Sequence, residues 1–405
     1  MSIIVQKYGG TSVDGPERIK RVAERVCRAA DEGHQVVVVV SAQGDTTDRL
    51  LDMARAVSAR PPRRELDMLL ATGEQVSIAL LAMAINALGH RAISLTGAQG
   101  GIMTDERHTK AKIRKVNPGR ITAELERGAI VIVAGFQGVS PDNDITTLGR
   151  GGSDTTAVAV AAALNAEMCE IYTDVRGVYS ADPRIVPEAR LLPVVDYDEM
   201  LELASLGALI LQPRAVEVAA IYGVPLHVRS SFTEDHGTIV REVADMEKTA
   251  AVTGVAHDDN CAQITIVGVP LSVNILQLVF GSLAEENINV DMIVKAGGQD
   301  STTTLSFTVQ RSDLPGALEA IRRLPGADEW DISSNENVAK VSIVGAGMMT
   351  NPGVAAAMFQ VLAAAGIPVE LVTTSEIKVS CLVPRHRLHE AVAACHTRFC
   401  LNGAI

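Results

Sequence analysis

The chain has 405 residues, of which 47% are hydrophobic and 21% charged, a globular composition long enough for two or three domains. Its 36 Lys and Arg against 48 Asp and Glu give a net charge of −12, and only 3% of the residues are aromatic. This balance argues against a nucleic-acid surface, an anionic-membrane surface or a base-stacking platform, and it favours small-molecule chemistry.

The cysteines and the N-terminus bear on the cellular compartment. Six cysteines are scattered without a C-x-x-C pair, which predicts reduced, buried thiols. Residues 1–10 lack the charged start and long apolar run of a signal peptide, and the apolar run 36–40 is too short to span a membrane. We therefore expect a cytoplasmic protein without a membrane segment.

In the first 245 residues, short β-branched runs alternate with longer Ala-, Leu- and Glu-rich stretches, the pattern of βα units around a mostly parallel sheet flanked by helices. The predicted helices cover 16–31 and 65–88, the second interrupted at Gly73. The predicted strands cover 3–5, 36–40, 92–95, 130–134, 170–173 and 226–229. We assign 1–245 to a catalytic domain and 246–260 to a linker.

The remaining residues contain an internal repeat. Residues 262–268 resemble 339–345, and residues 283–293 resemble 362–372. Each copy reads as strand, loop, amphipathic helix and strand, followed by a further strand, and such pairs are typical of ligand-sensing modules. We place the two modules at 261–335 and 336–405, the alternative being a continuation of the catalytic domain.

Four polar or glycine-rich clusters follow predicted strands, at 7–12, 41–48, 135–138 and 146–154. Glycine permits close backbone approach, and several such loops at one sheet edge would hold a polyphosphate. None of them matches the P-loop or the dinucleotide-binding pattern, and the protein-kinase motifs are missing from the sequence.

Four motifs carry a family resemblance: K-Y-G-G-T-S-V at 7–13, G-E-Q at 73–75, T-T-L-G-R-G-G-S-D-T-T at 146–156 and Y-T-D-V-R-G-V-Y-S-A-D-P-R at 172–184. Together they closely resemble aspartokinases of the amino acid kinase family. The resemblance covers essentially the whole chain, because those enzymes also end in two ACT modules. It implies an α/β amino acid kinase fold followed by two βαββαβ ACT modules. The implied reaction is the ATP-dependent phosphorylation of L-aspartate to 4-phospho-L-aspartate, the entry to lysine, threonine and methionine synthesis.

Elementary chemistry assigns the central residues. Phosphoryl transfer between two anions needs a cation, and Lys7 follows the first strand, beside Gly9 and Gly10. Aspartate carries two carboxylates and an ammonium, so Arg150 is a candidate clamp for its α-carboxylate and Glu74 a candidate partner for its ammonium.

Asp154 has three possible roles: it orders Lys7 and the loops, orients the substrate amine, or caps the helix that follows. Asp45 and Asp48 are equally compatible with solvated loop charges and with contacts to substrate or Mg²⁺.

The resemblance implies further contacts. Thr47 and Ser153 would bind the substrate, and Ser41 would lie near the transferred phosphoryl group. The nucleotide would be held by Lys7, Gly9, Gly10, Thr173, Asp174, Tyr179, Asp182 and Arg184. Mg²⁺ would be bound mainly by phosphate oxygens and water, with no dedicated metal site in the protein.

ACT modules of the family bind an amino acid where a loop and helix N-terminus of one copy face a strand of another. The resemblance therefore implies lysine or threonine as effectors and at least a homodimer. The candidate effector contacts are Met292, Ile293, Val294, Asn351, Pro352, Ser375 and Glu376. Asn274 in the first copy stands where the second copy has Gly353, which predicts two unequal sites.

Other positions depart from the family pattern. Leu209 replaces a lysine common in relatives, and Arg214 is a candidate to compensate for it. Arg176 and Lys295 also replace residues usual in the family. Two alternatives stay open: another amino acid kinase, which would share the sheet and the glycine-rich loops, and an ACT-type amino-acid sensor without catalysis, which only Leu209 favours.

Overall fold

A computed structural model describes residues 2–207, 210–243, 250–271, 274–297 and 302–401. The chain divides into two compact units. The first unit comprises residues 1–178, 191–205 and 209–244, and the second comprises 179–190, 206–208 and 245–405. Residues 179–190 thus belong to the second unit, although the sequence analysis assigns them to the catalytic domain. Leu209 and residues 244–249, which include the start of the predicted linker, lie outside the described residues.

An eight-stranded sheet forms the centre of the first unit, in the order β10-β12-β11-β9-β1-β2-β6-β3. Neighbouring strands are parallel except for β11 and β12. The six predicted strands are confirmed, four of them with longer bounds. The strands are β1 Ile3–Tyr8, β2 Gln35–Val40, β3 Ala92–Leu95, β6 Ile130–Ala134, β9 Met168–Thr173, β10 Val194–Val195, β11 Leu226–Ser230 and β12 Thr238–Val240.

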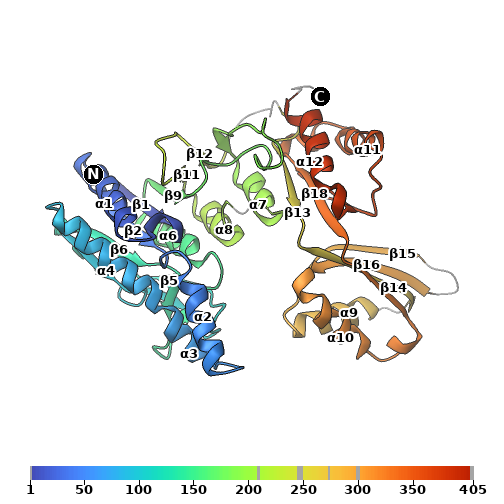
Figure 1. Cartoon of the computed structure of the whole chain (residues 1–405), viewed down its shortest axis with the longest axis horizontal. Coiled ribbons are helices and arrows are strands. Elements are labelled where there is room, and N and C mark those ends of the chain that lie inside the picture. The colour runs from blue at the N-terminus through green and yellow to red at the C-terminus, as the bar shows by residue number, and fades with distance from the viewer. Residues whose placement is uncertain (1, 208–209, 244–249, 272–273, 298–301, 402–405) are drawn as a thin grey trace. The chain divides into compact units, whose positions relative to one another are not determined.

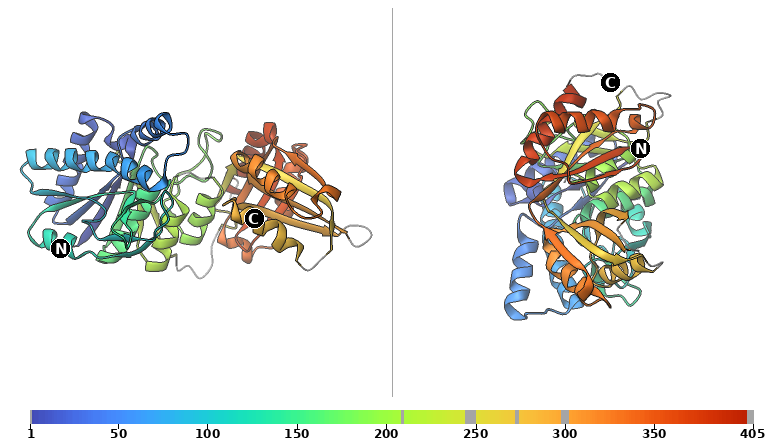
Figure 2. Two further views of the ribbon diagram at one scale, coloured as in Figure 1. Left: turned by 90° about the horizontal axis from the view of Figure 1, so that it is seen from below. Right: turned by 90° about the vertical axis from the view of Figure 1, so that its right-hand side faces the viewer.

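Helices cover both faces of this sheet (Figures 1 and 2). On one face α1 (Pro16–Asp31) and α4 (Thr72–Ala87) bury a core with β1, β2 and β6. The other face is covered by α6 (Gly152–Leu164), which packs on α8 (Pro213–Tyr222). The remaining helices of this unit are α2 Thr46–Val57, α3 Arg63–Leu70, α5 Gly119–Glu126 and α7 Tyr197–Ser205, with a short 3₁₀ turn at Gly10–Val13.

The predicted helix break at Gly73 is wrong. The break falls at Ala71, between α3 and α4, and Gly73 lies in the first turn of α4. A Cβ at Gly73 would lie 2.8 Å from the Cβ of Ala42, so glycine is required there by close packing against the loop after β2.

The stretch Arg63–Ala87, which contains α3 and α4, is long and apolar enough to cross a membrane by length and composition. Half of its most apolar window is buried inside the unit, and Ile78, Leu81 and Ile85 belong to the core. The stretch is therefore accounted for as a core helix pair.

A second, small sheet of the first unit was not predicted. Its strands are β4 (Ile102–Thr104), β5 (Ile113–Val116), β7 (Gln137–Val139) and β8 (Ile145–Thr147), in the order β5-β4-β7-β8. Strands β7 and β8 form an antiparallel pair, and β8 leads directly into the glycine-rich segment 149–152.

The second unit contains two four-stranded antiparallel sheets, one in each predicted module. The repeat predicts three strands for each copy, and β17 and β13 add the fourth strand to the first and second sheet. The first module has the sheet order β15-β16-β14-β17. Its elements are β14 Cys261–Pro270, α9 Ile275–Glu285, β15 Val290–Gly297, β16 Thr302–Gln310, α10 Leu314–Arg322 and β17 Asp331–Asn335.

The second module has the sheet order β13-β18-β20-β19, and its fourth strand precedes both modules in the chain. This strand, β13 (Gly254–Asp258), lies within the predicted linker and pairs antiparallel with β18. The other elements are β18 Val338–Val344, α11 Val354–Ala364, β19 Leu371–Thr374, β20 Lys378–Pro384 and α12 Leu388–His396.

Segment 179–190 packs on the second module. Ala181 and Val186 belong to that module's core. Ser180 is held on three sides: its carbonyl accepts from Val255 N–H at 2.8 Å, its amide donates to Arg190 O at 2.9 Å, and its Oγ lies 2.8 Å from His396 Nε2. The segment that contains part of the predicted nucleotide site is therefore ordered by ACT-module residues.

Candidate active site

Lys7 lies near the carboxyl end of β1, and its Nζ is 2.7 Å from Asp154 Oδ1. Both side chains are about nine-tenths buried. The two atoms form an ion pair without the alignment of a hydrogen bond. The N–H groups of the Lys7 ammonium therefore remain available to donate hydrogen bonds to other oxygen atoms. Asp154 makes no capping hydrogen bond to α6, so the structure supports the ordering role among the three that the sequence leaves open.

The first two glycine-rich clusters lie against each other. Gly44 N–H donates to Gly10 O at 3.1 Å, and a Cβ at Gly10 would lie 2.7 Å from Ala42 O. Ser41 N–H donates to Tyr8 O at 3.1 Å, which continues the pairing of β1 with β2 into the loops. Ser41 thus lies within this pair of loops.

The last two clusters join them at the same edge. Gly135 N–H donates to Val40 O at 3.0 Å, and a Cβ at Gly135 would lie 2.6 Å from Ser153 Oγ. A Cβ at Gly152 would lie 3.2 Å from Phe136 Cα. All four clusters therefore converge at the carboxyl ends of β1, β2 and β6, where ligands bind in open α/β sheets.

Glu74 points into this convergence from the first turn of α4. Its Oε1 accepts a hydrogen bond from Ala42 N–H at 3.0 Å, whereas its buried Oε2 has no hydrogen-bond partner. Burial raises the pKa of this carboxyl to about 7, and the Ala42 bond opposes that rise. A buried carboxylate oxygen without a partner is costly, so this geometry favours a cationic ligand group beside it.

Arg150 and Thr47 lie at the rim. Arg150 is exposed between Gly149 (φ +78°) and Gly151 (φ +71°), and it forms no ion pair with another described residue. Thr47 lies in the first turn of α2, half-buried. Its neighbour Thr46 approaches Gly73, so the start of α2 lies beside the start of α4.

The predicted nucleotide residues are divided between the two units. Thr173 ends β9 and donates to Asp174 Oδ1 at 3.1 Å. Gly9 N–H donates to Tyr172 O at 3.3 Å, so this strand end adjoins the Lys7 loop. Tyr179, Asp182 and Arg184 lie in the second unit, where the Arg184 Nη2 donates to Asp182 at 2.7 Å.

The structure shows the contacts of Arg176, which departs from the family pattern, and of Arg214, the candidate to compensate for Leu209. Arg176 pairs with Asp235 at 3.2 Å, and both side chains are largely exposed, which fits a solvated loop charge. Arg214 donates to two backbone carbonyls, Leu148 O at 2.9 Å and Ala111 O at 3.1 Å. Its guanidinium is therefore committed to the loop before Arg150, which disfavours the idea that it replaces the lysine absent at 209. Within the described ranges, no group of three or more His, Cys, Asp or Glu is arranged to hold a metal.

The candidate effector residues fall on two parts of the second unit. Met292 is buried in a cluster with Leu371 of the other module, and Ile293 points to the exposed face of β15. Val294 packs at the edge of that same cluster. Lys295 is exposed on β15, and Asn274 immediately precedes α9.

In the second copy, the loop before α11 lies beside the turn between β19 and β20. Gly345 N–H donates to Ile377 O at 2.9 Å, so the loop that leads to Asn351 and Pro352 leaves the sheet beside the turn that carries Ser375 and Glu376. Asn351 Nδ2 donates to Gly347 O at 2.8 Å, which fixes the loop ahead of α11.

Comparison with known proteins agrees with this arrangement. The amino acid kinase family matches residues 2–230, and the ACT domain matches residues 264–323 and 341–399. The aspartokinase of Bacillus sp. (strain MGA3) is 52% identical over 405 residues, which cover 100% of this chain and 98% of the relative. An aspartokinase of Thermus thermophilus is 50% identical over 406 residues, which cover 100% of both chains. The chain belongs to the aspartokinases of the amino acid kinase family.

Solved structures show the same fold. The E. coli aspartokinase III structure superimposes with a TM-score of 0.81 at 24% identity, covering 98% of this chain and 99% of that one. The aspartate kinase from Synechocystis is 45% identical with a TM-score of 0.56, covering 98% of this chain and 69% of that chain. The predicted succession of an amino acid kinase fold and two ACT modules is confirmed.

Sequence reasoning missed Asp67 in α3, a buried acidic residue that accepts a hydrogen bond from Thr147 in the fourth glycine-rich cluster. It lies three and four positions before Leu70 and Ala71, all three of them buried. A carboxylate on the buried face of a helix requires a partner elsewhere in the fold. The helical spacing of Asp67 from the apolar Leu70 and Ala71 could have marked it as a buried carboxylate, but the sequence does not identify its partner.

Proposed function

We propose that this aspartokinase transfers the γ-phosphoryl group of ATP to the side-chain carboxylate of L-aspartate, giving 4-phospho-L-aspartate and ADP. The observation that carries the proposal is the convergence of the Lys7 ammonium with the unpartnered Oε2 of Glu74 at one sheet edge. A cation for a phosphoryl group and an anion for an ammonium are the two charges that this substrate pair needs. Curated aspartokinases at about half identity over their whole length support it.

In this mechanism the β-carboxylate oxygen of aspartate attacks the γ-phosphorus and the bond to ADP breaks. Lys7 stabilises the charge on the transferred group, and Asp154 holds Lys7 in place. Glu74 binds the ammonium and Arg150 binds the α-carboxylate, which leaves the β-carboxylate as the nucleophile. Thr47 and Ser153 supply hydrogen bonds to the substrate, and Ser41 lies near the transferred phosphoryl group. Mg²⁺ bound with ATP would be held mainly by phosphate oxygens and water and would neutralise part of the phosphate charge.

The nucleotide contacts belong to the same proposal. Gly9 and Gly10 allow close approach of the phosphates, Thr173, Asp174, Tyr179 and Asp182 bind the adenosine part, and Arg184 binds phosphate. The ACT modules bind lysine or threonine as effectors. The protein forms at least a homodimer through these modules. Cys27, Cys169, Cys261 and Cys381 are free and buried, which fits a reducing cytoplasmic compartment.

A coupled assay of ADP release tests this function. We expect ADP to form with MgATP and L-aspartate, and not with MgATP alone or with L-glutamate. Turnover with glutamate instead of aspartate would favour another amino acid kinase. Effector binding without ATP turnover would favour a sensor.

The raised pKa of Glu74 predicts pH-dependent substrate binding. Because the substrate ammonium requires the ionised carboxylate, aspartate binding below pH 7 must release a proton from Glu74. We expect the aspartate KM to fall by about tenfold between pH 6 and pH 8 and to level off above pH 8, since the ionised fraction rises from about one tenth to nine tenths.

The pH profile is measured for the wild-type enzyme and for Glu74→Gln at saturating ATP. The substitution should remove the pH dependence of the aspartate KM and leave that of the ATP KM unchanged. A wild-type aspartate KM that stays constant from pH 6 to pH 8 would contradict the role of Glu74.

The two ACT copies should bind an effector unequally. The second copy keeps Gly353 at a left-handed φ of +98° ahead of α11, whereas the first has Asn274 at φ −97° ahead of α9. We expect titration calorimetry with lysine and threonine to show stronger binding at the site that includes Asn351, Pro352, Ser375 and Glu376 and a strand of the other copy.

The paired substitution Val273→Pro with Asn274→Gly gives the first copy the Pro-Gly pair that precedes the helix in the second copy. It should strengthen the weaker site. Two wild-type sites of matching affinity for each effector would rule out this asymmetry.

A further inference from the structure

Asp67 is a fully buried carboxylate with a complete set of partners in the first unit. Thr147 Oγ1 donates to its Oδ1 at 2.5 Å, and Thr109 N–H donates to both oxygens at 3.0 Å. His108 Nδ1 lies 2.8 Å from its Oδ2. A buried carboxylate satisfied in this way links α3, the 108–109 turn and β8 into one network.

The segment that this network holds is the one that ends in Arg150. Thr147 is the last residue of β8, three positions before Arg150, and its carbonyl accepts from Ala111 N–H at 2.9 Å. The next residue, Leu148, is fixed by Arg214, which donates to its carbonyl at 2.9 Å.

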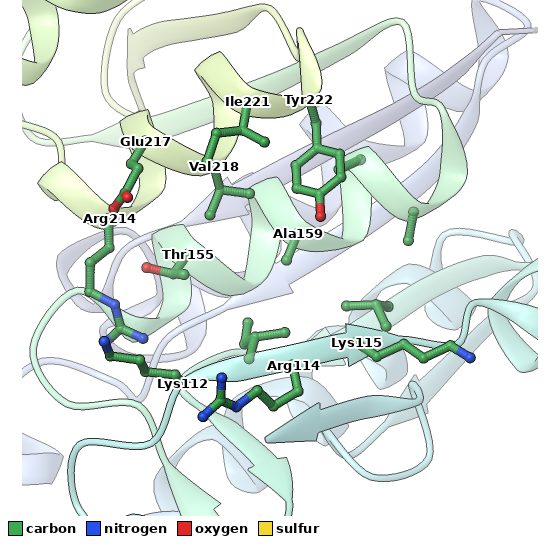
Figure 3. A pocket seen from close by; sticks show the side chains of 14 residues that line it. Lys112, Arg114, Lys115, Thr155, Ala159, Arg214, Glu217, Val218, Ile221 and Tyr222 are labelled. Atoms are coloured by element: carbon green, nitrogen blue, oxygen red, sulfur yellow. The ribbon is translucent and has the colours of Figure 1, made fainter. Parts of the chain in front are cut away.

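Arg214 comes from a different helix. Figure 3 shows it reaching from α8 past Thr155 of α6 toward Lys112, along the wall of a cleft of about 590 Å³ between α6, α8 and β5. Two independent anchors therefore hold consecutive residues of the loop: the Asp67 carboxylate from α3 binds Thr147, and the Arg214 guanidinium from α8 binds Leu148.

Beyond these anchors the loop depends on its glycines. Gly149 and Gly151 both have positive φ, and Arg150 between them is exposed without an ion pair to any described residue. A Cβ at Gly149 would lie 3.2 Å from Thr109 O, so the turn that Asp67 binds also lies against Gly149. The Arg150 side chain pairs with no other described residue, so its position depends on the backbone that carries it. Thr147 and Leu148 hold that backbone on one side, and the start of α6 holds it on the other, where Gly152 N–H donates to Gly149 O at 3.0 Å.

We infer that Asp67 is a positioning residue for aspartate recognition, acting through Thr147 to hold Arg150 at the α-carboxylate. This inference rests on the proposed function and adds a residue to its substrate site. Asp67 itself contacts Thr147, His108 and Thr109 rather than the substrate. Its loss should therefore change aspartate binding much more than ATP binding.

The substitution Thr147→Val tests the inference by removing one hydroxyl at nearly constant volume. We expect the aspartate KM to rise by about tenfold, with the ATP KM within about twofold of wild type. Thr147→Ser, which restores the hydroxyl, should return the aspartate KM to within about twofold of wild type. Asp67→Asn is a second variant, expected to shift the aspartate KM in the same direction, and it decides the matter if Thr147→Val does not fold.

Thr104→Val is the matched control. The Thr104 hydroxyl is also buried and lies 2.6 Å from Thr146 Oγ1, so it joins β4 to β8 without touching Asp67. It should lower the melting temperature and leave both KM values near wild type. An equal rise in both KM values with Thr147→Val, no rise, or the same aspartate effect with Thr104→Val would overturn the inference. Failure of the proposed function is distinct, because wild-type enzyme would then form no aspartate-dependent ADP.

Discussion

Replacing Lys7 with alanine should reduce kcat by on the order of 10²-fold or more while L-aspartate still binds. Lys7 is the buried cation at the convergence of the four glycine-rich loops, and Asp154 holds it at 2.7 Å. Its ammonium stabilises charge on the transferred phosphoryl group, and a side chain without charge cannot do so. Steady-state ADP release measures kcat, and titration calorimetry measures aspartate affinity.

Lys20→Ala is the matched control, because Lys20 is an exposed lysine of α1 paired with Glu17 at 2.8 Å. It should leave kcat within a few-fold of wild type. If Lys7→Ala also stays within a few-fold, Lys7 does not take part in phosphoryl transfer.

Arg150→Ala and Glu74→Gln should each raise the aspartate KM by roughly 10- to 150-fold, because a charge-assisted hydrogen bond contributes about 1.5–3 kcal/mol. The ATP KM should stay nearly unchanged, since neither side chain is assigned to the nucleotide. The two effects have different causes. Arg150→Ala removes the partner of the α-carboxylate, whereas Glu74→Gln replaces the anion beside the ammonium with a neutral amide.

Glu65→Gln is the control for the second substitution. Glu65 is an exposed glutamate of α3 that pairs with Arg64 at 2.7 Å, outside the loop convergence. It should change neither KM. Equal increases in both KM values for Arg150→Ala or Glu74→Gln would contradict the assignment to aspartate.

Periodic, core-forming elements could be predicted from the sequence, and elements without a local signal could not. Helix α1 has the predicted bounds because Pro16 is favourable at its first position and its buried face repeats regularly. Helix α2 was missed because it buries no residue fully and starts inside a polar loop. Strand β13 was missed because the strand it pairs with, β18, lies more than 80 residues further along the chain.

The same distinction holds for the site. Lys7, Glu74 and Asp154 were predicted because each lies in a short motif whose residue types indicate its chemistry. Asp67 was not, since its partners Thr109 and Thr147 come from segments 42 and 80 positions away. The placement of residues 179–190 on the second ACT module is also a product of tertiary packing.

The most direct test of the account is the identity of the phosphorylated carboxylate. Hydroxylamine traps an acyl phosphate as a hydroxamate, and mass spectrometry with synthetic standards distinguishes the α- from the β-aspartyl product. With Arg150 on the α-carboxylate and Glu74 on the ammonium, the wild-type enzyme should yield β-aspartyl hydroxamate in an ATP-dependent reaction, and Lys7→Ala should yield almost none. The α-aspartyl product, or no hydroxamate from wild-type enzyme that binds aspartate and MgATP, would contradict the account.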